Sequence, residues 1–343
     1  MAKLTIRDIA RLSGLSKSTV SLVLNNSPKV DPETRRRVIA VMREHNYVPS
    51  FAATALAKGN TGLIGMIVPG LTWRFMANIN YGVAKVVEDT KYEMVLFTST
   101  NERDYGGAID RVMSSGLCAG LIVVTHDQQP LDRLVDLHAG GLPLVLINTL
   151  GAVNALPSVG ADNYTGGLLV GRHLLELGHR RIAGILGPLD HPYVQERRSG
   201  LREALREAGL EPDPELEAET DFAEALIRSR TRELMALPAD RRPTALFAYH
   251  DSAAFTVLDE LVRAGVRVPQ DVSVVGFNDI DAAAHVRPAL TTVRQPFVDM
   301  GRQAARILMT ALDGVESDEE SQRVVLPTEL IVRDSTTSVP ADR

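Results

Sequence analysis

The chain has 343 residues, 45% hydrophobic and 23% charged, which is typical of a globular protein with a domain of about 60 residues and a larger bilobed one. Its single cysteine, Cys118, excludes an intrachain disulfide and a cysteine-rich metal site. The apolar runs are as short as strands and the amino terminus lacks the apolar core of a signal peptide, so we expect a cytoplasmic protein with no membrane partner.

The charge is distributed unevenly along the chain. Residues 1–60 contain ten Lys or Arg and four Asp or Glu, a net charge of +6, whereas the whole chain carries −6. The remaining residues therefore carry −12. A basic segment on an acidic protein favours DNA binding, because the segment neutralises phosphates while the acidic part keeps the molecule soluble without attracting DNA elsewhere.

Residues 5–14 predict a first helix. Thr5 with Asp8 forms a capping-box pattern at its start, and Gly14 is a typical helix stop. The apolar stripe between them consists of Ile6, Ile9 and Ala10. A short turn leads to the next helix, and two helices joined in this way are typical of a helix-turn-helix.

Ser16 is suited to cap the second helix, whose apolar residues Val20, Val23 and Leu24 recur at i, i+3 and i+4. Short polar side chains therefore face outward, where they can approach base edges and phosphates at the positive amino terminus of the helix. The candidate DNA contacts of this region are Thr5, Ser16, Lys17, Ser18, Thr19, Ser21, Leu22 and Asn25. A solvated amphipathic hairpin is the competing interpretation.

A third helix is predicted to begin after its cap, Asp31, with Pro32 in the first turn. The face expected to cover the first two helices consists of Val38, Ile39, Val41 and Met42. The exposed arginines Arg35, Arg36 and Arg37 are either phosphate contacts or a solvated face.

The segment after Tyr47 predicts a short hinge helix between Pro49 and Gly59. About nine residues are too few for a helix to be stable alone in water, so we expect it to form only against a partner copy and DNA. Leu56 would then insert between base steps from the minor groove. Tyr47 and Leu56 complete the candidate DNA contacts. A linker helix packed on the next domain is the alternative.

The rest of the chain contains a weak internal repeat of continuous apolar segments. The first three segments are residues 62–69, 120–125 and 143–148, and their counterparts are 181–188, 245–250 and 272–278. Amphipathic helical segments, such as residues 83–90 and 196–208, alternate with them. This pattern predicts an α/β protein in which the helical headpiece is followed by two doubly wound parallel-sheet lobes.

The residues that follow these strands predict a ligand site, because open parallel sheets bind ligands beyond the carboxyl ends of their strands. Aromatic faces, amides, carboxylates and one guanidinium occur there, and together they suit a polyhydroxylated ligand. The candidate ligand-binding residues are Trp73, Phe75, Thr125, Asn148, Arg197, Phe222, His250 and Asn278. Each of them taken singly is more often structural.

An enzyme is not expected from the motifs of the chain. It contains no Gly-x-Ser-x-Gly elbow, phosphate-cradling Gly-x-x-x-x-Gly-Lys, His-Glu-x-x-His or Gly-x-Gly-x-x-Gly. We therefore predict no catalytic residues, no metal and no cofactor. A solute-binding protein without a DNA role is the alternative function, although such a protein would not need a basic headpiece.

Several motifs occur in a characteristic order along nearly the whole chain. They are Ser16-x-x-Thr19-Val-Ser-x-Val-Leu-Asn25, Asn46-Tyr-x-Pro49, Leu56, Asp162-Asn-x-x-Gly-Gly167, Leu177-Gly-His-x-x-Ile182, Arg197-x-x-Gly200, Pro269-x-Asp-Val-Ser-Val-Val-Gly-Phe277 and Leu290-Thr-Thr-Val-Arg-Gln-Pro296. In this order the set resembles the LacI/GalR transcriptional regulators. The resemblance implies a DNA-binding headpiece (residues 1–47), a hinge helix (48–60) and an effector-binding and dimerisation domain (61–343) like type I periplasmic sugar-binding proteins.

The resemblance also implies how such a regulator works. It implies a homodimeric repressor on a pseudo-palindromic operator, switched by a sugar or sugar derivative bound between the lobes, with Arg197 as a ligand contact. The amino-terminal lobe is expected at about 61–160 and 291–320 and the carboxyl-terminal lobe at about 161–290 and 321–343. The chain would then cross between lobes near residues 160, 290 and 320.

Departures from the family pattern affect both sites. Leu22 stands where many members have a base-reading Arg or His, so an apolar contact, for instance with a thymine methyl, is expected there. In the cleft, Thr72-Trp-Arg-Phe75 replaces a frequent Asn-Pro-Phe-Phe, His250 replaces Asn and Asn278 replaces Asp. The lost carboxylate is a strong acceptor for sugar hydroxyls, so the effector need not be a common monosaccharide.

Overall fold

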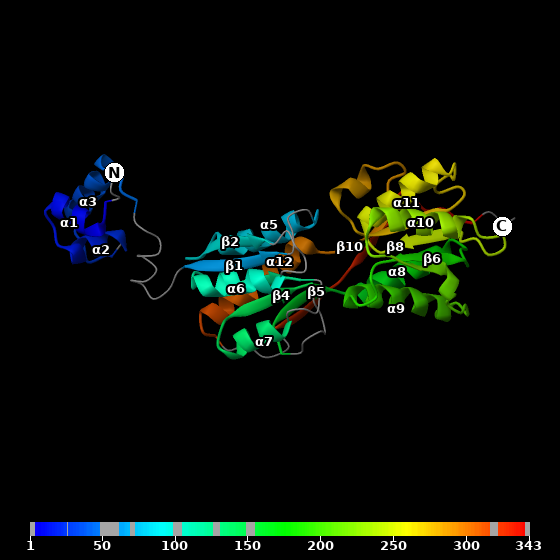
Figure 1. Ribbon diagram of the computed structural model, residues 1–343, viewed down its shortest axis with the longest axis horizontal. Coiled ribbons are helices and arrows are strands. Elements are labelled where there is room, and N and C mark those ends of the chain that lie inside the picture. The colour runs from blue at the N-terminus through cyan, green and yellow to red at the C-terminus, as the bar shows by residue number, and fades with distance from the viewer. Residues whose placement is uncertain are drawn as a thin grey trace. The chain divides into compact units, whose positions relative to one another are not determined.

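The computed structural model describes residues 4–25, 27–48, 62–68, 73–98, 105–125, 131–148, 155–315 and 322–339. The chain divides into two compact units, Met1–Gly62 and Leu63–Arg343 (Figure 1). The predicted hinge helix with Leu56 lies outside the described residues. Within the described ranges, no helix is long and apolar enough to cross a membrane.

The first unit contains helices α1 (Ile6–Ser13), α2 (Lys17–Leu24) and α3 (Pro32–Glu44), each with the predicted start. Asp8 accepts hydrogen bonds from Thr5 N at 2.9 Å and Thr5 Oγ1 at 2.7 Å. Ser16 Oγ accepts from Thr19 N at 3.1 Å, and Asp31 caps α3. Gly14 ends α1 at φ 66°, a left-handed conformation that glycine adopts without steric cost.

The core of this unit joins all three helices. Its fully packed members are Ile9, Ala10, Val20, Val23 and Val38. Val41 and Met42 pack against this core as predicted, whereas Ile39 is 38% exposed. The prediction for Ile39 was wrong because one residue turns a helix by about 100°, so Val38 and its neighbours at i+3 and i+4 share a face that position 39 leaves.

The second unit contains two six-stranded sheets. The first has the order β11-β5-β4-β3-β1-β2, with all strands parallel. Its strands are β1 (Leu63–Val68), β2 (Glu93–Thr98), β3 (Gly120–Val124), β4 (Leu144–Ile147), β5 (Ser158–Ala161) and β11 (Arg323–Leu326). We call this sheet and its helices the amino-terminal lobe.

The second sheet has the order β12-β10-β9-β8-β6-β7, and only its edge strand β12 is antiparallel among the described strands. Its strands are β6 (Ile182–Leu186), β7 (Glu217–Glu219), β8 (Ala245–Ala248), β9 (Ser273–Asn278), β10 (Thr291–Arg294) and β12 (Glu329–Ile331). This sheet and its helices form the carboxyl-terminal lobe. The doubly wound α/β class predicted from the sequence is confirmed.

Helices cover both faces of each sheet (Figure 1). In the amino-terminal lobe they are α5 (Met76–Val87) and α12 (Phe297–Leu312) on one face, and α6 (Tyr105–Ser115) and α7 (Leu131–Ala139) on the other. In the carboxyl-terminal lobe they are α8 (Asn163–Glu176) and α9 (Pro192–Glu207) opposite α10 (Glu224–Met235) and α11 (Asp251–Arg263), with 3-10 turns η2 (Pro214–Leu216) and η3 (Asp281–Ala284). Covering both faces explains why the strands read as continuous apolar runs.

The crossings between lobes differ from the expected positions. Strand β10 pairs with β9 in the carboxyl-terminal lobe, and β11 pairs with β5 in the amino-terminal lobe. The crossings therefore follow Ala161, Arg294 and Leu326, so the boundaries expected near 290 and 320 are corrected by four to six residues. Both strands have only four residues, and pairing with a neighbouring strand is what assigns each of them to a sheet.

In each lobe, one pair of helices packs closely because glycines lie at the contact between the two helices. In the amino-terminal lobe, a Cβ at Gly82 of α5 would overlap Val298 O of α12, and a Cβ at Gly301 would overlap Ile79 O. In the carboxyl-terminal lobe, Gly167 of α8 faces the backbone of Arg197, and Gly200 of α9 faces that of Tyr164. The two lobes thus share the same kind of glycine-mediated helix contact, in agreement with the internal repeat of the sequence.

Candidate functional site

The outer face of α2 presents most of the predicted DNA contacts. Lys17, Ser18, Leu22 and Asn25 are exposed, whereas Thr19 and Ser21 are half-buried. Leu22 is an exposed apolar residue, with 40% of its surface accessible. The helix thus presents short polar groups around one apolar side chain, a surface that fits the major groove.

The remaining predicted contacts have structural partners within the headpiece. Ser16 Oγ and Thr19 Oγ1 lie 2.8 Å apart at the start of α2, and Thr5 is bonded to Asp8. Tyr47 packs on the headpiece core, and this burial raises its pKa. These contacts fix the start of α2, where Ser16 Oγ already accepts from the Thr19 N–H.

The three arginines of α3 are not equivalent. Arg35 Nη2 donates to Ser27 O at 2.6 Å and thus holds the loop between α2 and α3. Arg36 Nε donates to Pro32 O at 3.3 Å within its own helix. Arg37 reaches back to Gly14, where a Cβ would lie 2.8 Å from its Nη2. Arg36 is therefore better placed than Arg35 for a phosphate.

A cavity of about 300 Å³ lies where the carboxyl ends of strands from both lobes meet. Seven of the eight predicted ligand-binding residues line it: Trp73, Phe75, Asn148, Arg197, Phe222, His250 and Asn278. Thr125 does not line this cavity, because it is 2% exposed and its backbone N–H donates to Ile147 O. The sheet buries this residue although it directly follows β3.

The other lining residues were not predicted. They are Arg74, Tyr193, Asp221, Ser252, Ile280, Gln295 and Phe297. Tyr193 lies one turn before Arg197 on α9, so the two residues share a face of the helix. This spacing could have identified Tyr193 as a lining residue once Arg197 was predicted. Gln295 and Phe297 follow β10 at a crossing between lobes, and the sequence analysis had placed that crossing too early.

Backbone strain is concentrated at this cavity. Asn148, Phe222, Asn278 and Asp279 have φ values of 72°, 66°, 117° and 52°, a region that residues other than glycine rarely adopt. The Phe222 ring occupies the space that a Cβ at Gly187 would need. Such strain persists where the surrounding fold imposes it, and it is typical of binding sites.

Arg197 is the buried cation of the cavity, with only 3% of its surface exposed. Its Nε donates to Asn163 Oδ1 at 2.9 Å and its Nη1 donates to Tyr249 O. The guanidinium carbon lies 3.7 Å from the centre of the Phe277 ring. Burial lowers the Arg197 pKa to about 10, so the side chain remains charged at neutral pH.

Arg197 does not form an ion pair with its sequence neighbour Glu196. Glu196 Oε2 instead accepts from Asn163 Nδ2 at 3.1 Å. Within the described residues Arg197 forms no ion pair, and its Nη2 has no hydrogen-bond acceptor. One nitrogen of the guanidinium is therefore available to a ligand.

His250 caps α11 and presents one nitrogen to the cavity. Its Nδ1 accepts from Ala253 N at 3.0 Å, so the proton of the neutral ring is on Nε2. Burial and the nearby charge of Arg197 lower the His250 pKa to about 4. At neutral pH the imidazole is therefore uncharged, with Nε2–H as a donor.

The two aspartates near the site have structural roles. Asp251 is fully buried and accepts from Ile280 N at 2.8 Å and Thr292 Oγ1 at 2.5 Å, and burial raises its pKa to about 7. Asp279 pairs with Arg294 at 2.8 Å and Arg333 at 2.6 Å. Neither aspartate lines the cavity.

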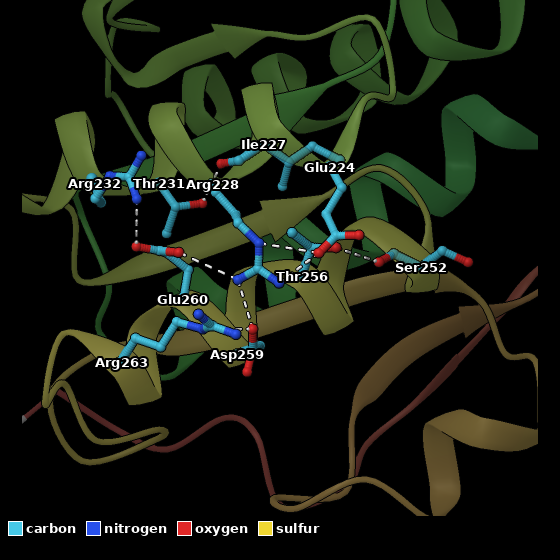
Figure 2. Close-up of polar contacts among 10 residues, drawn as sticks. All are labelled: Glu224, Ile227, Arg228, Thr231, Arg232, Ser252, Thr256, Asp259, Glu260 and Arg263. Atoms are coloured by element: carbon cyan, nitrogen blue, oxygen red, sulfur yellow. Dashed lines mark hydrogen bonds and ion pairs between the residues drawn. The ribbon is translucent and has the colours of Figure 1, made fainter.

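A charged network holds α10 to α11 behind the cavity. Arg228 of α10 contacts Glu224 at 2.6 Å, Asp259 at 2.6 Å and Glu260 at 3.3 Å (Figure 2). Arg232 adds a second contact to Glu260 at 3.1 Å. Both helices begin directly after cavity residues, so the network fixes the spacing of the segments that carry those residues.

The cysteine thiol and the potential metal-binding side chains give no indication of a catalytic site among the described residues. Burial raises the pKa of the Cys118 thiol to about 11, which disfavours the nucleophilic thiolate. Within the described ranges, no group of His, Cys, Asp and Glu side chains is arranged to hold a metal ion.

Two family models match the chain. The model for bacterial regulatory proteins of the lacI family matches residues 5–50, and a periplasmic binding protein-like domain matches residues 172–336. The matches coincide with the headpiece and with most of the carboxyl-terminal lobe.

Full-length relatives show the same organisation. The transcriptional regulator CelR of Thermobifida fusca is 36% identical over 96% of this chain and 98% of its own length. The regulator DegA of Bacillus subtilis is 30% identical over 97% and 98%, and the repressor CytR of Escherichia coli is 30% identical over 98% and 97%. All three are named as regulators or repressors, not enzymes.

Solved structures of transcriptional regulators also superpose on this chain. A CelR-cellobiose complex superposes with a TM-score of 0.70 at 34% identity, covering 97% of this chain and all of the other. The Lac repressor dimer bound to operator and an anti-inducer gives 0.84 at 25% identity, covering 98% and 100%. The chain therefore belongs to the LacI family of bacterial regulatory proteins, as the sequence predicted, and is a helix-turn-helix transcriptional regulator, not an enzyme.

Proposed function

We propose that this regulator binds a pseudo-palindromic operator as a homodimer and that a small molecule in the cleft, a sugar or sugar derivative, switches its operator affinity. The main observation in support of this switch is the cavity that contains Arg197, because residues from both lobes line the cavity. The relative solved with cellobiose and the Lac repressor solved on its operator support the two halves of the proposal. DNA binding also supports a cytoplasmic location, which is part of this proposal.

Repression is the expected direction of control, because PurR, CytR and the Lac repressor are named repressors. The alternative of a solute-binding protein without a DNA role is disfavoured, since the lacI-family match covers the headpiece itself. We propose contacts to DNA from Lys17, Ser18, Leu22 and Asn25 on α2, which are exposed.

Coupling between the two sites is proposed to work by population shift. A ligand that contacts both lobes stabilises one relative arrangement of them, and the hinge segments of a dimer then either meet on DNA or separate. Couplings of this kind are typically about 1–3 kcal/mol, so operator affinity would change about 5- to 150-fold.

Operator binding is expected to depend steeply on salt, because residues 1–60 carry +6. With roughly 6–10 phosphate contacts per dimer, affinity should fall about 10³- to 10⁵-fold between roughly 50 and 200 mM salt. A gel-shift series on the DNA upstream of the chain's own coding sequence measures this slope, with scrambled DNA of equal length as the control. A complex whose affinity did not change with salt would contradict phosphate neutralisation by the headpiece.

Leu56→Ala is expected to weaken specific operator binding at least tenfold, because a methyl group cannot replace the Leu wedge between base steps. Nonspecific DNA binding and effector affinity should change less than about threefold, since phosphate contacts and the cleft remain. Titration of operator and scrambled DNA with the same variant separates these effects. If both DNAs were bound as by the parent protein, the wedge role would be wrong.

A further inference from the structure

We propose that the cleft selects an acidic ligand, a polyhydroxylated organic acid with one carboxylate such as a uronate or aldonate, and that Arg197 and His250 bind the carboxylate. The inference rests on the proposed function, because it names the chemical class of the effector. It depends on polar groups for which the described part of the chain provides no hydrogen-bond partner.

The charges around the cavity favour an anion. Among its described lining residues, Arg74 and Arg197 are cationic and Asp221 is the one carboxylate. Asp221 is exposed, and its Oδ1 already accepts from Ala223 N at 2.9 Å. Neither arginine forms an ion pair with a described residue, although the charges of Glu196 and Asp251 act on Arg197 through space and partly offset the lowering of its pKa by burial. A ligand carboxylate would supply the direct ion pair that Arg197 lacks among the described residues.

The polar groups at the base of the cavity are mainly donors. Arg197 Nη2 and His250 Nε2–H are both without an acceptor among the described residues. Asn278 Oδ1 is occupied by Gln295 Nε2 at 2.6 Å, which leaves the Asn278 Nδ2 group as a third donor. Three donors next to a fixed positive charge match the two oxygens of a carboxylate better than they match neutral hydroxyls.

The buried carboxylate of Asp251 acts on Arg197 through space but does not accept hydrogen bonds from these donors. Asp251 adjoins His250 in sequence, but its oxygens accept from Ile280 N and Thr292 Oγ1, and it does not line the cavity. Among its described lining residues, the cavity therefore contains no buried carboxylate that would repel an anionic ligand.

The rest of the cavity suits a hydroxylated ring or chain and not a simple fatty acid. Gln295 is 5% exposed, and its buried Oε1 has no hydrogen-bond partner among the described residues. Phe75 and Phe297 stack with centroids 4.7 Å apart, and Trp73 lies 5.4 Å from Phe75. Such aromatic surfaces pack against the C–H faces of carbohydrates while polar groups bind the edges.

Calorimetry with matched ligands tests the charge preference. The probes are D-glucuronate, D-galacturonate and D-gluconate, each compared with its neutral parent sugar, and for the uronates also with the methyl ester. At least one acid is expected to bind the full-length protein at least tenfold more tightly than its neutral counterparts. Neutral compounds that bind as tightly as the acids, or a failure of all three acids to bind, would overturn the proposal.

Two substitutions with opposite effects on charge sharpen the test. Asn278→Asp is nearly isosteric and adds a negative charge beside the donors, so affinity for the acid should fall at least tenfold. Asp221→Asn removes a negative charge at the rim and should raise that affinity severalfold. Asp240→Asn is the control, because Asp240 is exposed and does not line the cavity. Equal acid affinity in all three variants would contradict an anion site.

Operator binding by the same preparations separates this inference from the proposed function. If neutral sugars, and not acids, bind in the cleft and change operator affinity, the acidic ligand is wrong and the regulator remains. If the protein fails to bind DNA in the gel shift, the proposed function is wrong whatever the cleft binds.

Discussion

Arg197→Lys is expected to abolish the effector response of operator binding and to lower effector affinity roughly 10- to 150-fold, equivalent to about 1.5–3 kcal/mol for a charged hydrogen bond. Two guanidinium nitrogens donate to Asn163 Oδ1 and Tyr249 O, and the third remains for a ligand in the cavity. The Lys ammonium is a single compact group that cannot reach all three positions. DNA binding should then stay in its effector-free state at effector concentrations that just saturate the parent protein.

The neighbouring Arg198→Lys provides the matched control. Arg198 also lies on α9, but it bonds Glu217 at 2.5 Å and does not line the cavity. Its variant should keep the effector response, and both variants should melt within a few degrees of the parent. Calorimetry and gel shifts measure the two properties. If Arg197→Lys retained the full response, Arg197 would be a structural residue, and His250, Asn278 and Trp73 would remain as candidates.

Gly200→Ala is expected to destabilise the carboxyl-terminal lobe by about 1–3 kcal/mol or more, because overpacked contacts force the backbone to shift. The added Cβ would overlap Tyr164 O and lie 2.7 Å from Leu168 N, and both are backbone atoms of α8. The separation of α8 from α9 would also move Arg197 away from Asn163. We therefore expect weaker effector binding together with a melting temperature lowered by roughly 2–4 °C per kcal/mol.

Gly106→Ala is the control for this substitution. Gly106 lies in α6, and a Cβ there would meet no atom within 4 Å. Alanine is the better helix former, so thermal stability should be unchanged or slightly higher. Differential scanning calorimetry of both variants tests the argument. A Gly200→Ala protein as stable as the parent would mean that the two helices do not need their close approach.

The sequence alone determined the features that depend on local chemistry. The caps at Thr5, Ser16 and Asp31 and the stop at Gly14 were predicted where the structure has them, because each acts within four residues of its helix end. The six predicted strands also match, since a parallel strand buried on both faces leaves a continuous apolar run. Seven of the eight candidate ligand-binding residues line the cavity, as expected from the rule that ligands of parallel sheets lie beyond the carboxyl ends of the strands.

Only the tertiary structure decided which of these groups meet and which are already occupied. Thr125 follows a strand yet is buried, whereas Gln295 and Phe297 enter the cleft because β10 pairs in the other lobe from the one expected. The partners of Arg197 and Asn278 come from residues 34 and 17 positions away and farther, so no local pattern reveals that one guanidinium nitrogen is unoccupied. Hydrogen-bond saturation and strand pairing are properties of distant segments brought together, and this is why the proposed ligand class is argued from the fold and not from the motifs.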